Sequence, residues 1–437
     1  MRAAVFVGLI AFAVYLASFR TIASVDASTN VLLGYTLVRD GDPFLDEFSP
    51  TYDRISYWSY RAGGHDAAIY PPGAAMLAAP VIALGLALRV EPPASASITL
   101  VGKTAAALAA AASVVFVHLA AARVAGAGIA MLVATLYAFG TVTWPISAGG
   151  LWQHGPAQLW IALGLWLLLS ADRRMRLRSG MAFGLAALTR PTAALFGIGG
   201  VLHLARRDRP AALAAAVWTM PAAVLLVAYD LVAFGQPLSP YYEPRSTANV
   251  AVGLAGLLIS PSRGLLVYSP FVAVGAYELV RRSLQRDDLG DLLRWQCLAA
   301  AAYFIVYASF VEWWGGTSYG PRYLAELLPL LSLGVALWLQ RHARDRRAVV
   351  AIGVLGAVGM VVAAAGALFY DWTGWSWELL MPADRLVWRW DLAQPWYTLE
   401  RGVTHSDPAA FIPLAFLGAG LVMLANVARR AMGTRGP

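Results

Sequence analysis

The chain has 437 residues, a length that in a soluble protein would correspond to two or three domains. Its composition excludes that class, because 59% of the residues are hydrophobic, only 13% are charged and the mean hydropathy is +0.61. The net charge of +8 would suit a nucleic-acid-binding protein, but the basic residues cluster in short loops between apolar runs, as in polytopic membrane proteins. We therefore predict an all-α polytopic membrane protein with no nucleic-acid partner.

Apolar runs recur along the chain, and in lipid such runs must be helical because every backbone amide has to be satisfied internally. We expect about 11–13 transmembrane helices in a single integral membrane domain covering residues 1–437. Run 73–89 is ambiguous, because it can either cross the membrane or lie in the interface. The other predicted segments are residues 3–19, 101–122, 127–145, 156–170, 181–204, 211–233, 264–280, 296–311, 322–340, 348–369 and 409–428.

Segment 181–204 is interrupted at its midpoint by Arg190-Pro191. A charge followed by a helix breaker indicates two half-helices, with Arg190 at the outer tip. The strongly basic loops can then all face the cytoplasm, provided that run 73–89 does not cross the membrane. If that run does cross, segment 181–204 must cross too and the arginines at 173–178 lie outside. We favour the first arrangement.

Four substantial loops then lie outside the cytoplasm: residues 20–100, which include juxtamembrane helices, the short loop 146–155, 234–263 together with 312–321, and the tryptophan-rich 370–408. The tryptophans can form an interfacial belt or a platform that stacks sugar rings. This topology places the protein in a bacterial inner membrane, with its site facing the periplasm or the exterior.

Asp26 lies just beyond the first hydrophobic segment and begins an acid-rich stretch of the first outer loop. A carboxylate held within hydrogen-bond reach of a hydroxyl can act as a general base, so Asp26 is the catalytic candidate. The alternative is that Asp26 caps a helix beginning near Ser28. Asp40 and Asp42 read as turn residues, and acids of this loop could also take a divalent cation.

Three arginines near the outer membrane edge are candidates for binding a phosphate. Arg190, Arg263 and Arg322 each lie beside a proline or glycine break next to an apolar run. Together they could form a fork-shaped clamp for a phosphate or pyrophosphate, although arginines at helix ends also simply extend to the interface. Further candidates for substrate contact are Asp42, His65 and His154 on the outer loops.

Several catalytic motifs are absent from the sequence, namely the His-Glu-x-x-His metal helix, the Gly-x-Ser-x-Gly elbow and any Cys/His metal spacing. The string Val101-Gly102-Lys103-Thr104 lacks the glycine and the preceding strand of a P-loop, and reads as a helix start.

An ordered set of motifs resembles the GT-C superfamily of polytopic glycosyltransferases, with the greatest likeness to bacterial members related to protein-O-mannosyltransferases and aminoarabinose transferases. The similar stretches are Asp26 with Asn30 and Tyr35, Tyr70-Pro71-Pro72-Gly73, Trp152-x-His154-Gly155, Leu188-Thr189-Arg190-Pro191, Ser260-Pro261-Ser262-Arg263-Gly264, and Trp313-Trp314-Gly315-Gly316-x-x-Tyr319-Gly320-Pro321-Arg322-Tyr323.

The resemblance implies that Asp26 is the base or acceptor-orienting acid, that Arg190, Arg263 and Arg322 lie near the donor phosphate, and that Tyr70 and Tyr319 are substrate-binding candidates. Many relatives carry a second acid directly after the first, whereas Ala27 follows Asp26 here. That difference argues against a two-carboxylate or metal-assisted mechanism and places more weight on Asp26, with Asp42 or His154 as candidate helpers.

We therefore expect a glycosyltransferase that moves a sugar from a polyprenyl-phosphate lipid to a glycan, lipid or protein acceptor of the cell envelope. No cofactor is required by this interpretation, although a divalent cation is possible. The alternatives are a transporter or flippase of a lipid-linked or polar substrate, and a non-catalytic envelope scaffold. Transporters usually show repeats and polar groups near the membrane midplane, whereas the charges here cluster at the outer ends of the segments.

Overall fold

A computed structural model describes residues 1–18, 24–48, 59–90, 95–240, 249–370, 375, 383–405 and 411–433. Nearly all of this structure is helical, and the described residues contain one two-stranded antiparallel sheet. Five helices are long and apolar enough to cross a membrane, and six shorter apolar helices accompany them. The predicted all-α polytopic membrane protein is therefore confirmed.

The long apolar helices account for most of the bundle because alanine, leucine and valine dominate them, and these residues leave no side-chain polar group unsatisfied in lipid. In chain order the helices of the bundle are α1 (Arg2–Ala17), α4 (Ser95–Val124), α5 (Ala127–Phe139), α6 (His154–Leu168), α7 (Arg173–Thr189), α8 (Ala194–Ala205), α9 (Arg209–Phe234), α10 (Val250–Ile259), α11 (Leu265–Tyr268), α12 (Val272–Ser283), α13 (Asp288–Ala308), α14 (Leu328–Arg341), α15 (Arg346–Phe369) and α19 (Ile412–Gly433).

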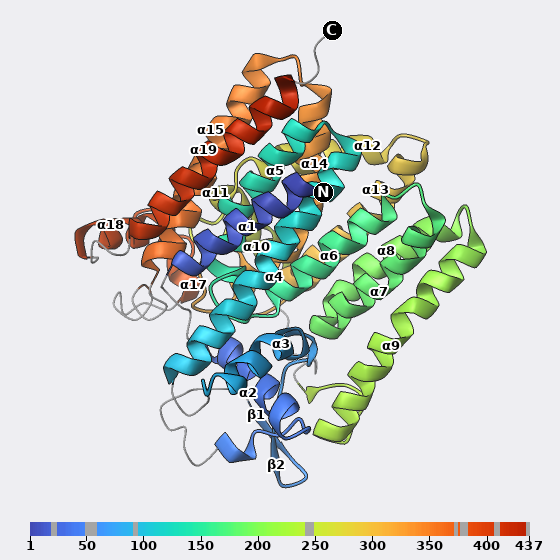
Figure 1. Ribbon diagram of the computed structural model, residues 1–437, viewed down its shortest axis with the longest axis vertical. Helices are drawn as coiled ribbons and strands as arrows, with labels where there is room; N and C mark the ends of the chain where they lie inside the picture. Colours follow the sequence, from blue (N-terminus) through green and yellow to red (C-terminus); the bar gives the residue numbers. More distant parts are fainter. Residues whose placement is uncertain are drawn as a thin grey trace.

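Helix α4 packs against α1, α5, α6 and α14, and α7 packs between α6 and α9 (Figure 1). Small residues allow the closest crossings, as is usual between membrane helices. A Cβ at Gly180 of α7 would lie 1.9 Å from the carbonyl oxygen of Ala215 in α9, and one at Gly275 of α12 would lie 2.3 Å from that of Leu331 in α14. These two crossings therefore require glycine.

The predicted break at Arg190-Pro191 is present. Helix α7 ends at Thr189, Arg190 has an extended backbone (φ −150°, ψ 104°), and a short 3-10 turn over Pro191–Ala193 leads into α8. The two half-helices pack against each other, so the chain enters and returns instead of continuing straight. Arg190 lies at the tip of this hairpin.

Two other predicted segments are also broken. Segment 264–280 divides into α11 and α12 around Ser269-Pro270, since proline cannot continue the helix that precedes it. Segment 127–145 ends as α5 at Phe139 and resumes as a π-helical turn, η2 (Thr143–Ser147).

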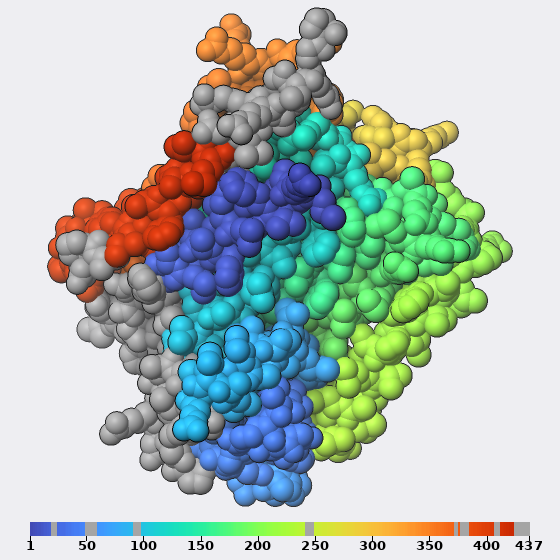
Figure 2. All heavy atoms as spheres, in the orientation of Figure 1, coloured from blue at the N-terminus to red at the C-terminus, as the bar shows by residue number. Residues whose placement is uncertain are grey.

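The long loop after α1 folds over one end of the bundle (Figure 1). It contains α2 (Val25–Arg39), a 3-10 turn η1 (Asp46–Phe48), the hairpin β1 (Ser59–Ala62) and β2 (His65–Ala68), and α3 (Gly73–Ala87). Figure 1 shows these elements together at the lower end, beside the end of α9, and Figure 2 shows them as one continuous mass of atoms. Helix α3, from the ambiguous run 73–89, packs along α2.

Helix α9 attaches this layer to the bundle. Tyr229 Oη donates to the carbonyl oxygen of Ala68 at 2.9 Å, and Ser239 Oγ donates to that of Ile69 at 2.9 Å. Asp230 Oδ2 in turn accepts from the Ser239 amide at 3.2 Å. These hydrogen bonds attach the strand that leads into Tyr70 to α9 and to the segment that follows α9.

The remaining short elements include a 3-10 helix, η5 (Arg322–Leu327), which continues into α14, and the short helices α17 (Ala383–Leu386) and α18 (Gln394–His405). Much of loop 370–408, including Trp372 and Trp377, lies outside the described residues. Trp388, Trp390 and Trp396 are 41%, 61% and 45% exposed, an exposure that fits an interfacial belt and a stacking surface equally.

Candidate active site

Asp26 is positioned by the first turn of α2. Ser24 is the N-cap, and its Oγ accepts a hydrogen bond from the amide of Ala27 at 3.1 Å. The capping role that was the alternative for Asp26 therefore belongs to Ser24. Asp26 lies in the first helical turn, where the helix dipole favours a negative charge, and its carboxylate is available for contacts outside the helix.

Two side chains from distant parts of the chain hold the Asp26 carboxylate. Tyr70 Oη donates to Oδ1 at 2.8 Å, and Arg322 Nη1 donates to Oδ2 at 2.9 Å. The Asp26 side chain remains 25% exposed and that of Arg322 14% exposed. This carboxylate is thus oriented by a phenol and a guanidinium but still accessible from outside.

A second charged group lies beside the first and is almost completely buried. Arg190 Nη1 lies 3.2 Å from Glu326 Oε1, and Arg190 Nε donates to Tyr307 Oη at 2.6 Å. His154 Nδ1 lies 2.8 Å from both Arg190 Nη1 and Glu326 Oε1. In the tautomer with a protonated Nδ1, that atom donates to Glu326 Oε1, and the unprotonated Nε2, 3.2 Å from Arg190 Nη1, accepts from the guanidinium. The side chains of Arg190, His154 and Glu326 are 8%, 3% and 0% exposed.

Both groups face one small cavity of about 20 Å³, lined by Asp26, Asn30, Tyr70, Trp152, Gln153, His154, Arg190, Arg322 and Tyr323. Tyr323 lies between the two arginines, with its ring 5.2 Å from the Arg322 guanidinium and 5.6 Å from that of Arg190. Trp152 lies against the other face of Arg322 at 4.7 Å. Aromatic rings that pack on both guanidinium groups restrict their orientation.

One residue of the lining, Asn30, connects Asp26 to the bundle. Asn30 is buried, and its Nδ2 donates to the carbonyl oxygens of Asp26 at 3.1 Å and Leu151 at 2.9 Å. It therefore joins the first turn of α2 to the loop that carries Trp152 and His154. The sequence had placed Asn30 within a motif but had given it no role.

The structure does not bring Arg263 into this cavity. Arg263 is fully buried, and its guanidinium donates to the carbonyl oxygens of Trp314 at 2.7 Å and Gly316 at 2.9 Å and to Gln394 Oε1 at 2.6 Å. The indole of Trp375 covers it at 4.9 Å. The loop that Arg263 contacts also packs against Arg322, since a Cβ at Gly315 would lie 3.1 Å from Arg322 Cγ. Arg263 thus holds in place the loop against which Arg322 packs.

Three predicted substrate contacts also lie elsewhere. Asp42 is a turn residue whose Oδ1 accepts from the amide of Phe44 at 2.9 Å. His65, on β2, stacks on Phe44 and pairs with Asp46 at 2.6 Å. Tyr319 is buried in the bundle, where its hydroxyl donates to the carbonyl oxygen of Val362 at 2.7 Å. The structure brings together Asp26, Tyr70, His154, Arg190 and Arg322. Among the described residues, no three histidine, cysteine or acidic side chains form a group that could hold a metal ion.

Glu326 is the important residue that sequence reasoning missed. It lies in an apolar stretch that reads as the start of a membrane helix, and an ionisable residue within such a segment is a signal of function or of a buried ion pair. That signal was present in the sequence and could have pointed to Glu326.

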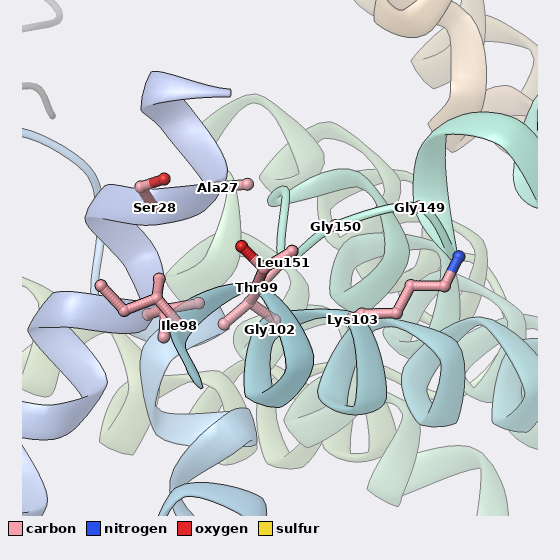
Figure 3. A pocket seen from close by; sticks show the side chains of 10 residues that line it. Ala27, Ser28, Ile98, Thr99, Gly102, Lys103, Gly149, Gly150 and Leu151 are labelled. Carbon is pink, nitrogen blue, oxygen red and sulfur yellow. The ribbon is translucent and has the colours of Figure 1, made fainter. Parts of the chain in front are cut away.

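A second hollow lies on the other side of the first turn of α2. Ala27, Ser28, Gly102, Lys103 and Gly149 are among its lining residues (Figure 3). Lys103 is buried in α4, where its Nζ donates to Ser18 Oγ at 3.2 Å. The string 101–104 is therefore part of a helix, as predicted, and has no phosphate-binding loop geometry.

A scan against protein-family models and a search of curated proteins gave no match for this chain. Among solved structures, the chain is similar to ArnT from Cupriavidus metallidurans bound to undecaprenyl phosphate, with a TM-score of 0.56 and 16% sequence identity. The match covers 98% of this chain and 74% of ArnT. The resemblance deduced from the motifs is confirmed at the level of the fold: the chain shares the fold of ArnT.

Proposed function

We propose that this protein is a glycosyltransferase that moves a sugar from a polyprenyl-phosphate lipid to a hydroxyl group of a glycan, lipid or protein acceptor. The observation that carries the proposal is the cavity in which an accessible carboxylate, Asp26, lies beside two arginines, Arg190 and Arg322. A proton acceptor and two anion-binding groups in one cavity are what sugar transfer from a phosphate requires.

Asp26 acts on the acceptor. Its carboxylate takes the proton of the attacking hydroxyl as the oxygen forms a bond to the anomeric carbon of the sugar. The bond between that carbon and the phosphate oxygen breaks, and the polyprenyl phosphate leaves with the electron pair. Tyr70 donates to Oδ1 and so fixes the rotation of the carboxylate about its last bond.

Arg322 acts on the donor. In this structure it donates to Asp26, and a phosphate in the cavity competes for the same guanidinium because both are anions that accept its N–H groups. Donor binding therefore frees Asp26 to accept a proton. Arg190, with part of its charge balanced by Glu326, supplies the second positive group for the charge that develops on the leaving phosphate.

The fold supports a lipid donor. ArnT, which shares the fold, was crystallised with undecaprenyl phosphate, and the apolar helices around the cavity suit a substrate with a long isoprenoid tail. The positive-inside distribution supports a site on the outer face of a bacterial inner membrane.

The test uses the purified full-length protein and a panel of polyprenyl-phosphate sugars that carry a radiolabelled sugar. Sugar release that depends on added acceptor is the expected result. Asp26→Asn, which keeps the shape of the side chain, should reduce it by a factor of about 100 or more, whereas Asp42→Asn, an acid outside the cavity, should leave it unchanged.

Two results would count against the proposal. Near-normal turnover by correctly folded Asp26→Asn protein would remove Asp26 from the mechanism. Movement of the intact lipid across liposome membranes, without cleavage of the sugar–phosphate bond, would instead identify a flippase.

A further inference from the structure

A pocket with a strongly basic lining lies at the other end of α8 from Arg190. It is formed by the C-terminal end of α8, the connection between α12 and α13, and the first turns of α13, and its volume is about 430 Å³. Its charged lining residues are Arg206, Arg207, Arg286, Arg294, Asp287 and Asp291. Four guanidinium groups against two carboxylates leave the pocket with an excess of positive charge.

The two carboxylates already have partners. Asp287 accepts two hydrogen bonds from Arg282, at 2.8 and 2.7 Å, and one from the amide of Gly290 at 2.7 Å. Asp291 Oδ2 lies 3.0 Å from Nδ1 of the buried His203. These carboxylates therefore have reduced capacity to neutralise the arginines of the pocket.

Of the four arginines, Arg207 forms a close ion pair, with its Nε 3.1 Å from Asp288 Oδ1, and Arg294 donates one hydrogen bond to the carbonyl oxygen of Ser283 at 3.0 Å. The remaining contacts are looser. Arg206 and Arg294 approach Asp291 Oδ1 only to 3.6 Å, which is too long for a hydrogen bond. Arg286 is exposed and forms no ion pair with any residue in the described part of the chain. Three guanidinium groups with unused donors around one pocket favour an oxyanion such as a phosphate.

Apolar side chains continue from the pocket along the outside of the bundle. Ile198 and Leu202 of α8 are 54% and 38% exposed, and Leu298 of α13 is 54% exposed. Helices α8 and α13 pack against each other, and their apolar parts are the ones expected in hydrocarbon. The pocket thus lies where the apolar surface ends, which is the depth of lipid headgroups.

We propose that this pocket binds the phosphate headgroup of an anionic phospholipid, whose acyl chains lie along Ile198, Leu202 and Leu298. Basic pockets between membrane helices on the cytoplasmic side are suited to such headgroups. Helix α8 has 12 residues and so places the pocket roughly 18 Å of helix away from the Arg190 tip. The lipid is therefore a ligand distinct from the proposed sugar donor, and this inference does not depend on the proposed function.

The test measures lipid binding by native mass spectrometry of the full-length protein in an uncharged detergent. Three probes are titrated: a diacyl phosphatidylglycerol, a phosphatidylcholine with the same chains, and soluble sn-glycerol 3-phosphate. We expect phosphatidylglycerol to bind about tenfold more tightly than phosphatidylcholine, and glycerol 3-phosphate not to displace it at equal concentration.

Variants locate the site. Arg206→Gln/Arg286→Gln should weaken phosphatidylglycerol binding about tenfold. Arg346→Gln/Arg347→Gln removes two exposed arginines at the start of α15, outside the pocket, and should change it by less than about twofold. If the first double variant does not fold, Arg286→Gln alone serves, because this side chain has no ion pair to lose among the residues that the structure describes.

Equal affinity for the two lipids, or unchanged binding in a folded pocket variant, would overturn the site. Displacement of the lipid by glycerol 3-phosphate at equal concentration would overturn the lipid assignment and identify a site for a soluble phosphate ester.

Discussion

Arg322 donates to the carboxylate of Asp26 across 2.9 Å although 296 residues separate them in the chain. The ion pair joins α2 to η5, the 3-10 helix that leads into α14, and so it closes the cavity between two parts of the protein that are far apart in sequence. In the proposed reaction the same guanidinium must also bind a phosphate. The pair is therefore a contact that donor binding should exchange for another.

Arg322→Gln should weaken donor binding and leave the protein folded. The glutamine can still donate to Asp26 but carries no charge for the phosphate, so we expect the KM for the lipid donor to rise about tenfold or more, because hydrogen bonds to charged groups contribute about 1.5–3 kcal/mol. Steady-state kinetics together with a thermal-unfolding curve of the same sample would test this. An unchanged KM would remove Arg322 from the donor site.

Glu326→Gln should reduce both activity and stability. Glu326 is the carboxylate next to Arg190 in a fully buried position, and removal of one partner of a buried ion pair typically costs about 3–5 kcal/mol. With the negative charge lost, Arg190 is free to shift within the cavity, so kcat should fall. The measurements are the melting temperature in detergent and the turnover of donor.

Glu278→Gln provides a matched control for that variant. Glu278 is also buried and pairs with Arg281 at 2.5 Å and Arg341 at 3.4 Å, but it does not line the cavity. It should lower the melting temperature without a specific loss of kcat. If both variants lose the same fraction of activity, Glu326 has only a structural role.

Arg263→Lys should lower stability more than donor affinity. Lysine cannot reach the carbonyl oxygens of Trp314 and Gly316 and the side chain of Gln394 at once, as the fork of arginine does. Loss of these buried contacts should cost about 2–4 kcal/mol, seen as a lower melting temperature. A variant that melts normally but no longer binds donor would restore Arg263 to the phosphate site.

The parts of the site that sequence predicted are those with a strong local signal. Arg190-Pro191 combines a charge with a helix breaker inside an apolar run, and the structure breaks at that point. Asp26 and Tyr70 lie in a polar loop directly after an apolar segment, where side chains face the membrane edge. In each case a few neighbouring residues carried the information.

Tertiary packing decided the rest. Arg263 and Arg322 have similar local sequences, each after a proline turn and before an apolar helix, yet only Arg322 reaches the cavity. The difference arises because the loop that contains Trp314 and Gly316 covers Arg263 and uses its donors. The sequence around Arg263 contains no signal that a loop about 50 residues further along the chain covers this side chain.

The orientation of the protein in the membrane gives a last prediction. In a Cys297→Ser background, a cysteine at Asp42 should react with a membrane-impermeant maleimide in intact spheroplasts, because Asp42 belongs to the layer that contains Asp26. A cysteine at Arg174, exposed at the start of α7, should react only after the membrane is permeabilised, because basic loops stay in the cytoplasm. Each labelled fraction is compared with that of the same sample in detergent. Labelling of both positions in intact spheroplasts would mean that α7 and α8 do not form a hairpin within the membrane, and that α3 crosses it instead. Labelling of Arg174 alone would reverse the orientation and place the cavity around Asp26 in the cytoplasm, where the proposed outer-face reaction could not occur.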